Sequence, residues 1–403
     1  MEEGQPPKAE EILSALTVGR EIFLDPFVAL YLDRFIRGEN GTAGSKVKFV
    51  TSNEGSGGKT HLLRVIAQEG RLRNYQSVYL RAGAFKLHYI HQFYAAIIGS
   101  LDLELLLAGV RKKVIQKLGY VPEEIPQSFS FIAWAEQKGE ALEMVRKGLR
   151  TELGRFLQNP RMDRNFSLAL IQIVLGDLEQ GSHWKEPERR QALLDWFSAR
   201  PELSISMLRR ENIFVRITRQ NARRMLSSLA ELTRMAGFSG LVVCLDEMDD
   251  LLAPKLDGRG TKYTKMSRED TFESLRELID DQENLQSMLF LLAARRDLLD
   301  DEKRGLKSYP ALWNRIREEI SSRDAFNPYV DLIDLDRLWS FQEKENITQH
   351  LGESLLSLFR KSLPNREFHG PDPETLNSVL EIHPFNVRHA TRILSAHLRR
   401  QLR

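Results

Sequence analysis

Residues 53–60 combine glycines, a lysine and a threonine in the pattern of a phosphate-binding loop. An apolar run at 47–50 predicts a strand before the loop, and 61–67 predicts the first turns of a helix after it. Strand, turn and helix N-terminus together present backbone N–H groups to phosphate oxygens, and the helix dipole adds positive potential. The residues expected to contact the phosphates of a nucleoside triphosphate are Asn53, Glu54, Gly55, Ser56, Gly57, Gly58, Lys59, Thr60 and His61.

Two side chains of this loop suit a bound triphosphate. The ammonium group of Lys59 is expected to reach the β- and γ-phosphates, and the Thr60 hydroxyl to bind Mg²⁺. Position 53 departs from the usual pattern, which has glycine there. Asparagine is among the non-glycine residues that best tolerate positive φ, so the turn can still form. Taken alone, the segment also fits a chance glycine-rich loop.

A pair of adjacent carboxylates follows an apolar run far along the chain. Residues 240–245 read Gly-Leu-Val-Val-Cys-Leu, and Asp246 and Glu247 come directly after them. Four or more apolar residues without alternation suit the central strand of a parallel sheet. An Asp at such a strand end lies beside the phosphate loop and holds Mg²⁺, directly or through water. The next Glu is then placed to orient or deprotonate attacking water, so the order predicts binding and hydrolysis of ATP.

Bulk composition agrees with a cytoplasmic protein of two or three domains. The chain has 403 residues, of which 42% are apolar, and a formal net charge of +2. A single cysteine excludes an internal disulfide framework, and its place in the apolar run before Asp246 predicts inert packing. The first residues are acidic and polar, unlike a signal peptide. No stretch approaches 18 uninterrupted apolar residues, so no membrane partner is expected.

The predicted fold is an α/β P-loop NTPase, AAA+-like, with a parallel sheet, a large helical insertion and a C-terminal helical lid. Further strands are predicted at 77–80, 287–294 and 330–335. The interval from Lys59 to Asp246 is far longer than one crossover helix and one strand need, which predicts the insertion. The predicted divisions are an N-terminal tail and helix (1–36), the first part of the ATPase core (37–99), the insertion (100–215), the second part of the core (216–336) and the lid (337–403).

Arg295 follows the strand at 287–294, where many ATPases carry a polar residue that senses the γ-phosphate. An ordinary charged strand end fits Arg295 equally well. The order of phosphate loop, carboxylate pair, sensor-like strand and C-terminal helices resembles AAA+ or closely related P-loop ATPases. This resemblance implies a regulated ATPase that changes conformation as it turns over.

Other arginines acquire candidate roles from the same resemblance. Arg323 resembles the arginine finger of origin-initiator-type ATPases, in which one subunit of an oligomer completes the site of the next and stabilises transition-state charge. Arg315 is the second choice, and both also fit surface or salt-bridge arginines. In the lid, 384–388 is similar to the start of a sensor-bearing helix capped by Asn386. Arg388 would contact the γ-phosphate from that helix.

Several stretches resemble the P-loop ATP-binding proteins of BREX-type phage-defence systems, over roughly residues 25–335. They are 46–50, 60–64, the His-x-x-x-x-x-Tyr spacing from His88 to Tyr94, 237–241 before the carboxylates, and 275–280. The resemblance implies ATP binding and action alongside other defence-system proteins, such as a methyltransferase, a helicase or other ATPases. It also implies association with DNA, and it does not supply a substrate.

Two arginine-rich segments give separate support for a DNA partner, since basic stripes can neutralise phosphates. Charge runs of this kind are also typical of solvated faces or of intrachain ion pairs. A basic loop at 255–265, predicted to be mobile and followed by a helix at 269–282, is the first candidate for DNA contact. The arginines are Arg209, Arg210, Arg216, Arg219, Arg223 and Arg224 in the first segment, and Arg388, Arg392, Arg399, Arg400 and Arg403 in the second.

Three hypotheses follow for the function. The first is an ATP-driven switch in a phage-defence complex, acting on partners or DNA. The second is an AAA+ DNA-loading regulator of the origin-initiator or transposition type. The third is a scaffold that senses nucleotide without hydrolysing it, although pure binding does not require Glu247.

Overall fold

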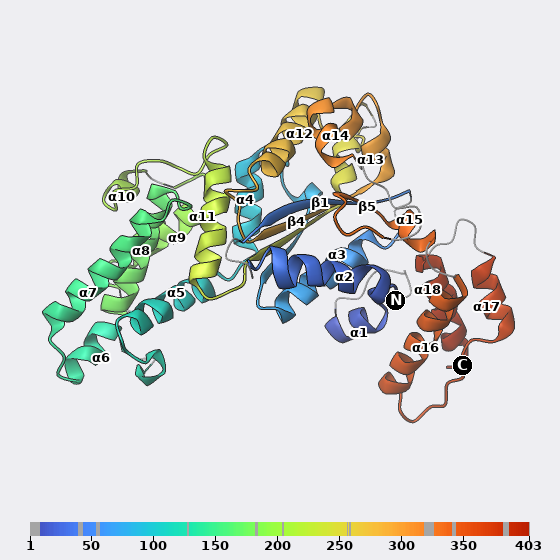
Figure 1. The fold of residues 1–403 in the computed structure, drawn as a ribbon, viewed down its shortest axis with the longest axis horizontal. Helices are drawn as coiled ribbons and strands as arrows, with labels where there is room; N and C mark the ends of the chain where they lie inside the picture. The colour runs from blue at the N-terminus through green and yellow to red at the C-terminus, as the bar shows by residue number, and fades with distance from the viewer. Residues whose placement is uncertain are drawn as a thin grey trace.

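The computed structural model describes residues 9–38, 43–53, 57–126, 129–181, 184–203, 205–255, 257, 259–317, 326–340, 344–381 and 387–402. These residues fold around one parallel sheet of five strands with the order β2-β3-β4-β1-β5 (Figure 1). All five predicted strands are present, and the α/β class is confirmed. The strands are β1 (Ser45–Ser52), β2 (Gln76–Arg81), β3 (Leu241–Asp246), β4 (Met288–Arg295) and β5 (Leu332–Asp334).

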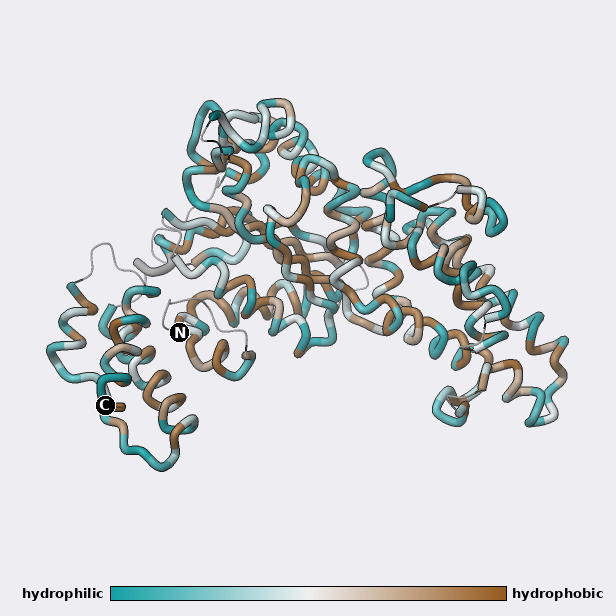
Figure 2. The backbone as a smooth tube through the Cα atoms, turned by 180° about the vertical axis from the view of Figure 1, so that it is seen from behind, coloured by the Kyte–Doolittle hydropathy of each residue, from teal (hydrophilic) through white to brown (hydrophobic). Residues whose placement is uncertain are grey.

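Successive side chains of each strand pack on opposite faces of the sheet. From β3, Leu241, Val243 and Leu245 join the hydrophobic core on one face, while Val242 and Cys244 join the core on the other. Because both faces are covered, the central strands carry apolar residues at consecutive positions. The apolar centre of the molecule is visible along the backbone in Figure 2.

The face that carries Val242 and Cys244 is covered by helices from the N-terminal part of the chain. They are α3 (Lys59–Leu72) and α2 (Asp25–Val28), the latter flanked by π-helical turns at Arg20–Leu24 and Ala29–Phe35. The helical run is continuous through Pro26, which lies where the first π-helical turn passes into α2.

Cys244 is fully buried between β3 and α3. Its Sγ donates to the carbonyl oxygen of Leu63 at 3.4 Å, and burial raises the pKa of the thiol. The cysteine is buried in the core, as predicted.

Among the described residues between β2 and β3 there are eight α-helices. The first and last, α4 and α11, lie beside the sheet, while those between them extend away from it (Figure 1). The boundaries of an insertion at 100–215 stay a prediction. The helices are α4 (Ile90–Gly99), α5 (Leu103–Lys117), α6 (Phe131–Gln137), α7 (Leu142–Gly154), α8 (Arg164–Gln180), α9 (Pro187–Phe197), α10 (Ile205–Arg209) and α11 (Ala222–Met235).

Between β3 and β5 the chain forms α12 (Lys265–Asp280), α13 (Arg296–Asp300) and α14 (Pro310–Ile316). The predicted start of α12 at 269 is wrong, because Thr264 caps the helix by accepting the N–H of Ser267. Backbone hydrogen bonds join the two ends of the basic loop before α12. Pro254 and Thr261 pair as an antiparallel bridge, and the Lys262 N–H donates to the Ala253 carbonyl at 2.8 Å.

A lysine lies in the buried middle of β1. The Lys48 ammonium group donates to three backbone carbonyls of 328–330 and pairs with Asp331 at 3.2 Å. The ring of Tyr31 lies 4.6 Å from it, and burial lowers the lysine pKa to about 8. These contacts hold the segment that leads into β5 against β1.

The C-terminal helices have their own hydrophobic core. They are α16 (Lys344–Ser362), α17 (Pro373–Leu380) and α18 (Val387–Arg400), which follow α15 (Leu335–Ser340). Leu16, directly after α1 (Glu10–Ala15), is buried in the same core. The start of the chain therefore packs against its last helices (Figure 1).

Among the described residues, no single helix is long and apolar enough to cross a membrane. The bent pair formed by α4 and α5 passes the same test by length and composition only.

Candidate functional site

The predicted phosphate loop connects the carboxyl end of β1 to the first turn of α3. Gly58 precedes this helix with φ 92°, a left-handed conformation in which a side chain would be strained. Lys59 and Thr60 are the first two residues of α3, so the helix N-terminus faces the loop. Glu54, Gly55 and Ser56 lie outside the described residues.

Thr60 and Asp246 meet at the carboxyl edge of the sheet. The Thr60 hydroxyl donates to Asp246 Oδ2 at 2.6 Å, although the two residues are 186 positions apart. Asp246 ends β3 and is only 2% exposed. A hydroxyl and a carboxylate side by side are oxygen ligands of the type that Mg²⁺ prefers. The structure thus brings the predicted pair together, and Mg²⁺ binding by these two residues stays a prediction.

The Lys59 side chain is buried beside several acidic groups. Its ammonium group donates to Ser52 Oγ at 2.7 Å. Burial lowers the pKa of Lys59, and the nearby charges of Asp249, Asp246 and Asp336 oppose this shift. A buried cation at a helix N-terminus is suited to an anionic phosphate.

Glu247 adopts an unusual backbone conformation immediately after β3. Its φ and ψ are 61° and 36°, which is rare for a residue other than glycine. The chain therefore turns sharply, and the half-exposed Glu247 carboxylate is separated from the buried Asp246. Arg81, at the end of β2, lies 3.7 Å from Glu247 Oε1 and pairs in register with Asp246.

Arg295 reaches the same edge of the sheet from the end of β4, between β1 and β3. It forms ion pairs with Asp249 at 3.3 Å and Asp297 at 3.6 Å. Its positive charge contributes to the lowered pKa of Lys59, after burial of the lysine itself. Its role as a sensor stays a prediction.

A further acidic residue contacts the loop from the C-terminal side of the chain. Asp336, in the first turn of α15, accepts the backbone N–H of Asn53 at 2.5 Å. Sequence reasoning missed Asp336, since nothing local distinguishes it from an ordinary helix-start acid.

His61 has a side chain directed toward the N-terminal segment. Its Nε2 lies 3.1 Å from Thr17 Oγ1, and burial lowers its pKa to about 4. A contact between His61 and phosphate would therefore fall to its backbone N–H.

Three other arginines, Arg315, Arg323 and Arg388, also have predicted roles. Arg323 is outside the described residues, as is Asn386, the predicted cap of the lid helix. Arg388 is in the first turn of α18, among the C-terminal helices. Arg315, the alternative finger, is held by Asp280 of α12.

Most arginines of the 209–224 segment bind other parts of this chain. Arg216 donates to the backbone carbonyl of Leu203 at 2.7 Å, and Arg224 to that of Met162 at 3.2 Å. The ion pairs are Arg219–Asp270 at 3.0 Å and Arg223–Glu277 at 3.2 Å. These contacts match the intrachain alternative considered for the segment.

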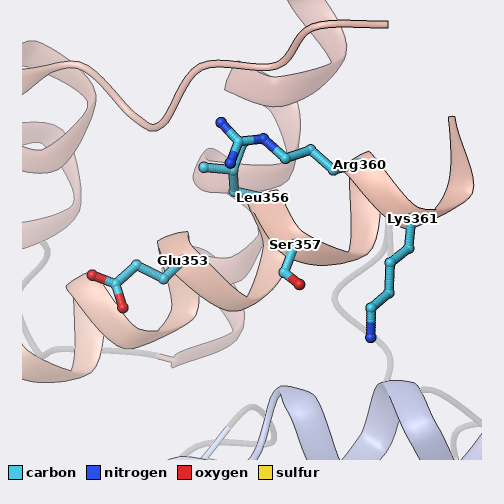
Figure 3. Close-up of a pocket in the computed structure, with 5 residues that line it drawn as sticks. All are labelled: Glu353, Leu356, Ser357, Arg360 and Lys361. Carbon is cyan, nitrogen blue, oxygen red and sulfur yellow. The ribbon is translucent and has the colours of Figure 1, made fainter. Parts of the chain in front are cut away.

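A surface pocket of about 470 Å³ lies on α16, away from these residues (Figure 3). All five of its lining residues belong to that one helix, and none is a predicted site residue. They are Glu353, Leu356, Ser357, Arg360 and Lys361.

Comparison with known proteins agrees with the geometry of the phosphate-loop edge. A family model described as BREX system ATP-binding protein BrxC/D matches residues 4–368. No curated protein and no solved structure matches the chain. The matched range contains both halves of the site and extends beyond the stretches that suggested the resemblance. The chain therefore belongs to the BREX system ATP-binding protein family BrxC/D.

Proposed function

We propose that this protein binds and hydrolyses ATP with Mg²⁺ as a conformational switch in a phage-defence complex. The observation that supports this most is the 2.6 Å contact between Thr60 and Asp246, next to the buried Lys59. Residues that are distant in sequence meet at one point, and their chemistry fits a magnesium-bound triphosphate.

Each residue has a separate task in the proposed reaction. Lys59 and the loop N–H groups bind the β- and γ-phosphates, and Thr60 and Asp246 hold Mg²⁺. The ion, when bound, neutralises charge that develops on the phosphate oxygens. Glu247, turned away from Asp246 by its left-handed backbone, orients the attacking water and accepts its proton.

Two contacts support transmission of the nucleotide state to the C-terminal helices. At the front of α3, Asp336 of α15 accepts the N–H of Asn53. In the first turn of α3, His61 contacts Thr17, next to Leu16 in the C-terminal core. A change at the phosphate loop would therefore act on both contacts that connect the loop and α3 to these helices.

The sheet order favours the AAA+-like variant of the fold, because β4 with Arg295 lies between the phosphate-loop strand and the carboxylate strand. In this proposal the C-terminal helices act as the lid that carries Arg388. Arg323 would serve a neighbouring copy in a homo-oligomer. The partners are other proteins of the defence system, with DNA as an additional ligand, and the location is cytoplasmic.

Glu247→Gln tests hydrolysis separately from binding. Removing a general base lowers turnover about 10²- to 10⁴-fold, while ATP affinity should change little. Phosphate release and binding of a fluorescent ATP analogue measure the two quantities. Glu302→Gln, at an exposed position, is the control.

Unchanged turnover in Glu247→Gln would remove this residue from the mechanism. A wild-type protein that binds ATP but shows no turnover, with DNA and partners present, would favour the nucleotide-sensing scaffold. Hydrolysis that depends on DNA loading by an oligomer would favour the DNA-loading regulator.

A further inference from the structure

The Asp246 carboxylate accepts three hydrogen bonds from the part of the chain that the structure describes. Its Oδ2 receives the hydroxyls of Thr60 and of Tyr79, each at 2.6 Å. Its Oδ1 receives the backbone N–H of Glu247 at 2.8 Å. Only the bond to Thr60 is implied by the sequence motif, and Tyr79 was not among the predicted site residues.

These bonds decide which oxygen remains available. An ionised carboxylate has about four acceptor positions, two on each oxygen. Among the described residues, the Thr60 and Tyr79 hydroxyls use both positions on Oδ2, whereas Oδ1 retains one. Direct bonding of a metal ion to Oδ2 would therefore break a short hydrogen bond in the buried site.

Tyr79 is well fixed for this role. It lies in β2, paired in register with Cys244 of β3, two residues before Asp246. The guanidinium group of Arg64 lies 5.4 Å from the centre of its ring. Its hydroxyl donates to Asp246 Oδ2 at 2.6 Å, so the ring and the hydroxyl are both held in place.

We propose that Tyr79 is a positioning residue that fixes the Asp246 carboxylate. The fixed carboxylate then acts on Mg²⁺ in two ways: it orients the Thr60 hydroxyl, and it offers the remaining acceptor position on Oδ1. The inference rests on the proposed function, because it concerns the ion that accompanies the nucleotide. Hydrogen-bond partners of this kind tune metal sites without touching the metal.

Tyr79→Phe removes the hydroxyl and keeps the ring beneath Arg64. The experiment measures binding of a fluorescent ATP analogue, first in EDTA and then across a MgCl₂ titration. Loss of a residue that supports a metal ligand typically weakens metal binding about 10- to 100-fold. The Mg²⁺ concentration that gives half-maximal enhancement of analogue binding should rise about tenfold. The affinity for the analogue in EDTA should stay within about twofold of wild type.

Tyr75→Phe is a matched control. The Tyr75 hydroxyl also donates a 2.6 Å hydrogen bond, to the carbonyl oxygen of Leu32, and burial raises its pKa. Both variants lose one 2.6 Å hydrogen bond of a tyrosine hydroxyl, and both should lose thermal stability. Only Tyr79→Phe should change how binding of the ATP analogue depends on Mg²⁺ concentration.

The outcomes separate this inference from the proposed function. If wild type shows Mg²⁺-enhanced binding and both variants match its Mg²⁺ dependence, the inference is overturned and the proposed function stands. If wild type binds no nucleotide with or without Mg²⁺, the proposed function and this inference both fail.

Discussion

Two regions of this protein are rich in charged side chains. In one region these side chains gather at a single site, and in the other they bind separate partners. At the carboxyl edge of the sheet, Lys59, Asp246 and Arg295 come from distant segments and lie close together. In the segment 209–224, arginines that are close in sequence bind other parts of the chain, namely the Leu203 carbonyl and two acids of α12. Closeness in sequence is therefore a poor guide to a shared binding surface here, whereas the order of strands is a good one.

Lys59→Met, at the carboxyl edge of the sheet, should have the largest effect on ATP affinity. Removing a buried cation that contacts phosphate typically costs several kcal/mol, so ATP affinity should fall about 100-fold or more. Equilibrium binding of a fluorescent ATP analogue measures this. Lys303→Met, at an exposed position, should bind like wild type. Equal affinity in the two variants would contradict the placement of nucleotide at this edge.

Asp336→Asn, at the same edge of the sheet, should change ATP affinity in the opposite direction. The carboxylate contacts the loop N–H of Asn53 and adds negative charge near Lys59, where it would repel a triphosphate. Neutralising it should raise ATP affinity about fivefold, or about 1 kcal/mol. Glu345→Gln, in the first turn of α16, is the control. Weaker binding in Asp336→Asn would show that the acid supports the nucleotide instead of competing with it.

The second region is tested by a double variant, Arg219→Gln with Arg223→Gln. Loss of two partly exposed ion pairs should lower the free energy of unfolding by about 1 kcal/mol, measured by urea denaturation. Binding to duplex DNA across a salt series should match wild type. Arg209→Gln with Arg210→Gln, at exposed positions, is the comparison pair.

A loss of DNA affinity and a shallower salt dependence in Arg219→Gln/Arg223→Gln, greater than in the comparison pair, would restore the segment as a DNA surface.

Much of the fold could be predicted because buried parallel strands have a strong pattern. The apolar runs that form β3 and β4 stand out from their surroundings, and the carboxylates follow directly after β3. Strand ends of a parallel sheet gather at one edge, so the meeting of Thr60 and Asp246 follows from the order of the motifs.

The residues that were missed depend on pairing between strands. Tyr79 and Arg81 reach the site only because β2 lies next to β3 in a particular register. Lys48 reads as a polar interruption of β1, yet it is fully buried because the carbonyls of 328–330 satisfy it. Such partners are hundreds of positions away, and the local pattern carries no trace of them.

The burial of Cys244 has a practical consequence for following motion in this molecule. It is the chain's one cysteine, its thiol is enclosed between β3 and α3, and its raised pKa disfavours the reactive thiolate. A cysteine introduced on the surface of α16 would therefore take up a maleimide dye with little background. Paired dyes on α16 and α12 would then report by energy transfer whether nucleotide moves the C-terminal helices, without first removing a native thiol.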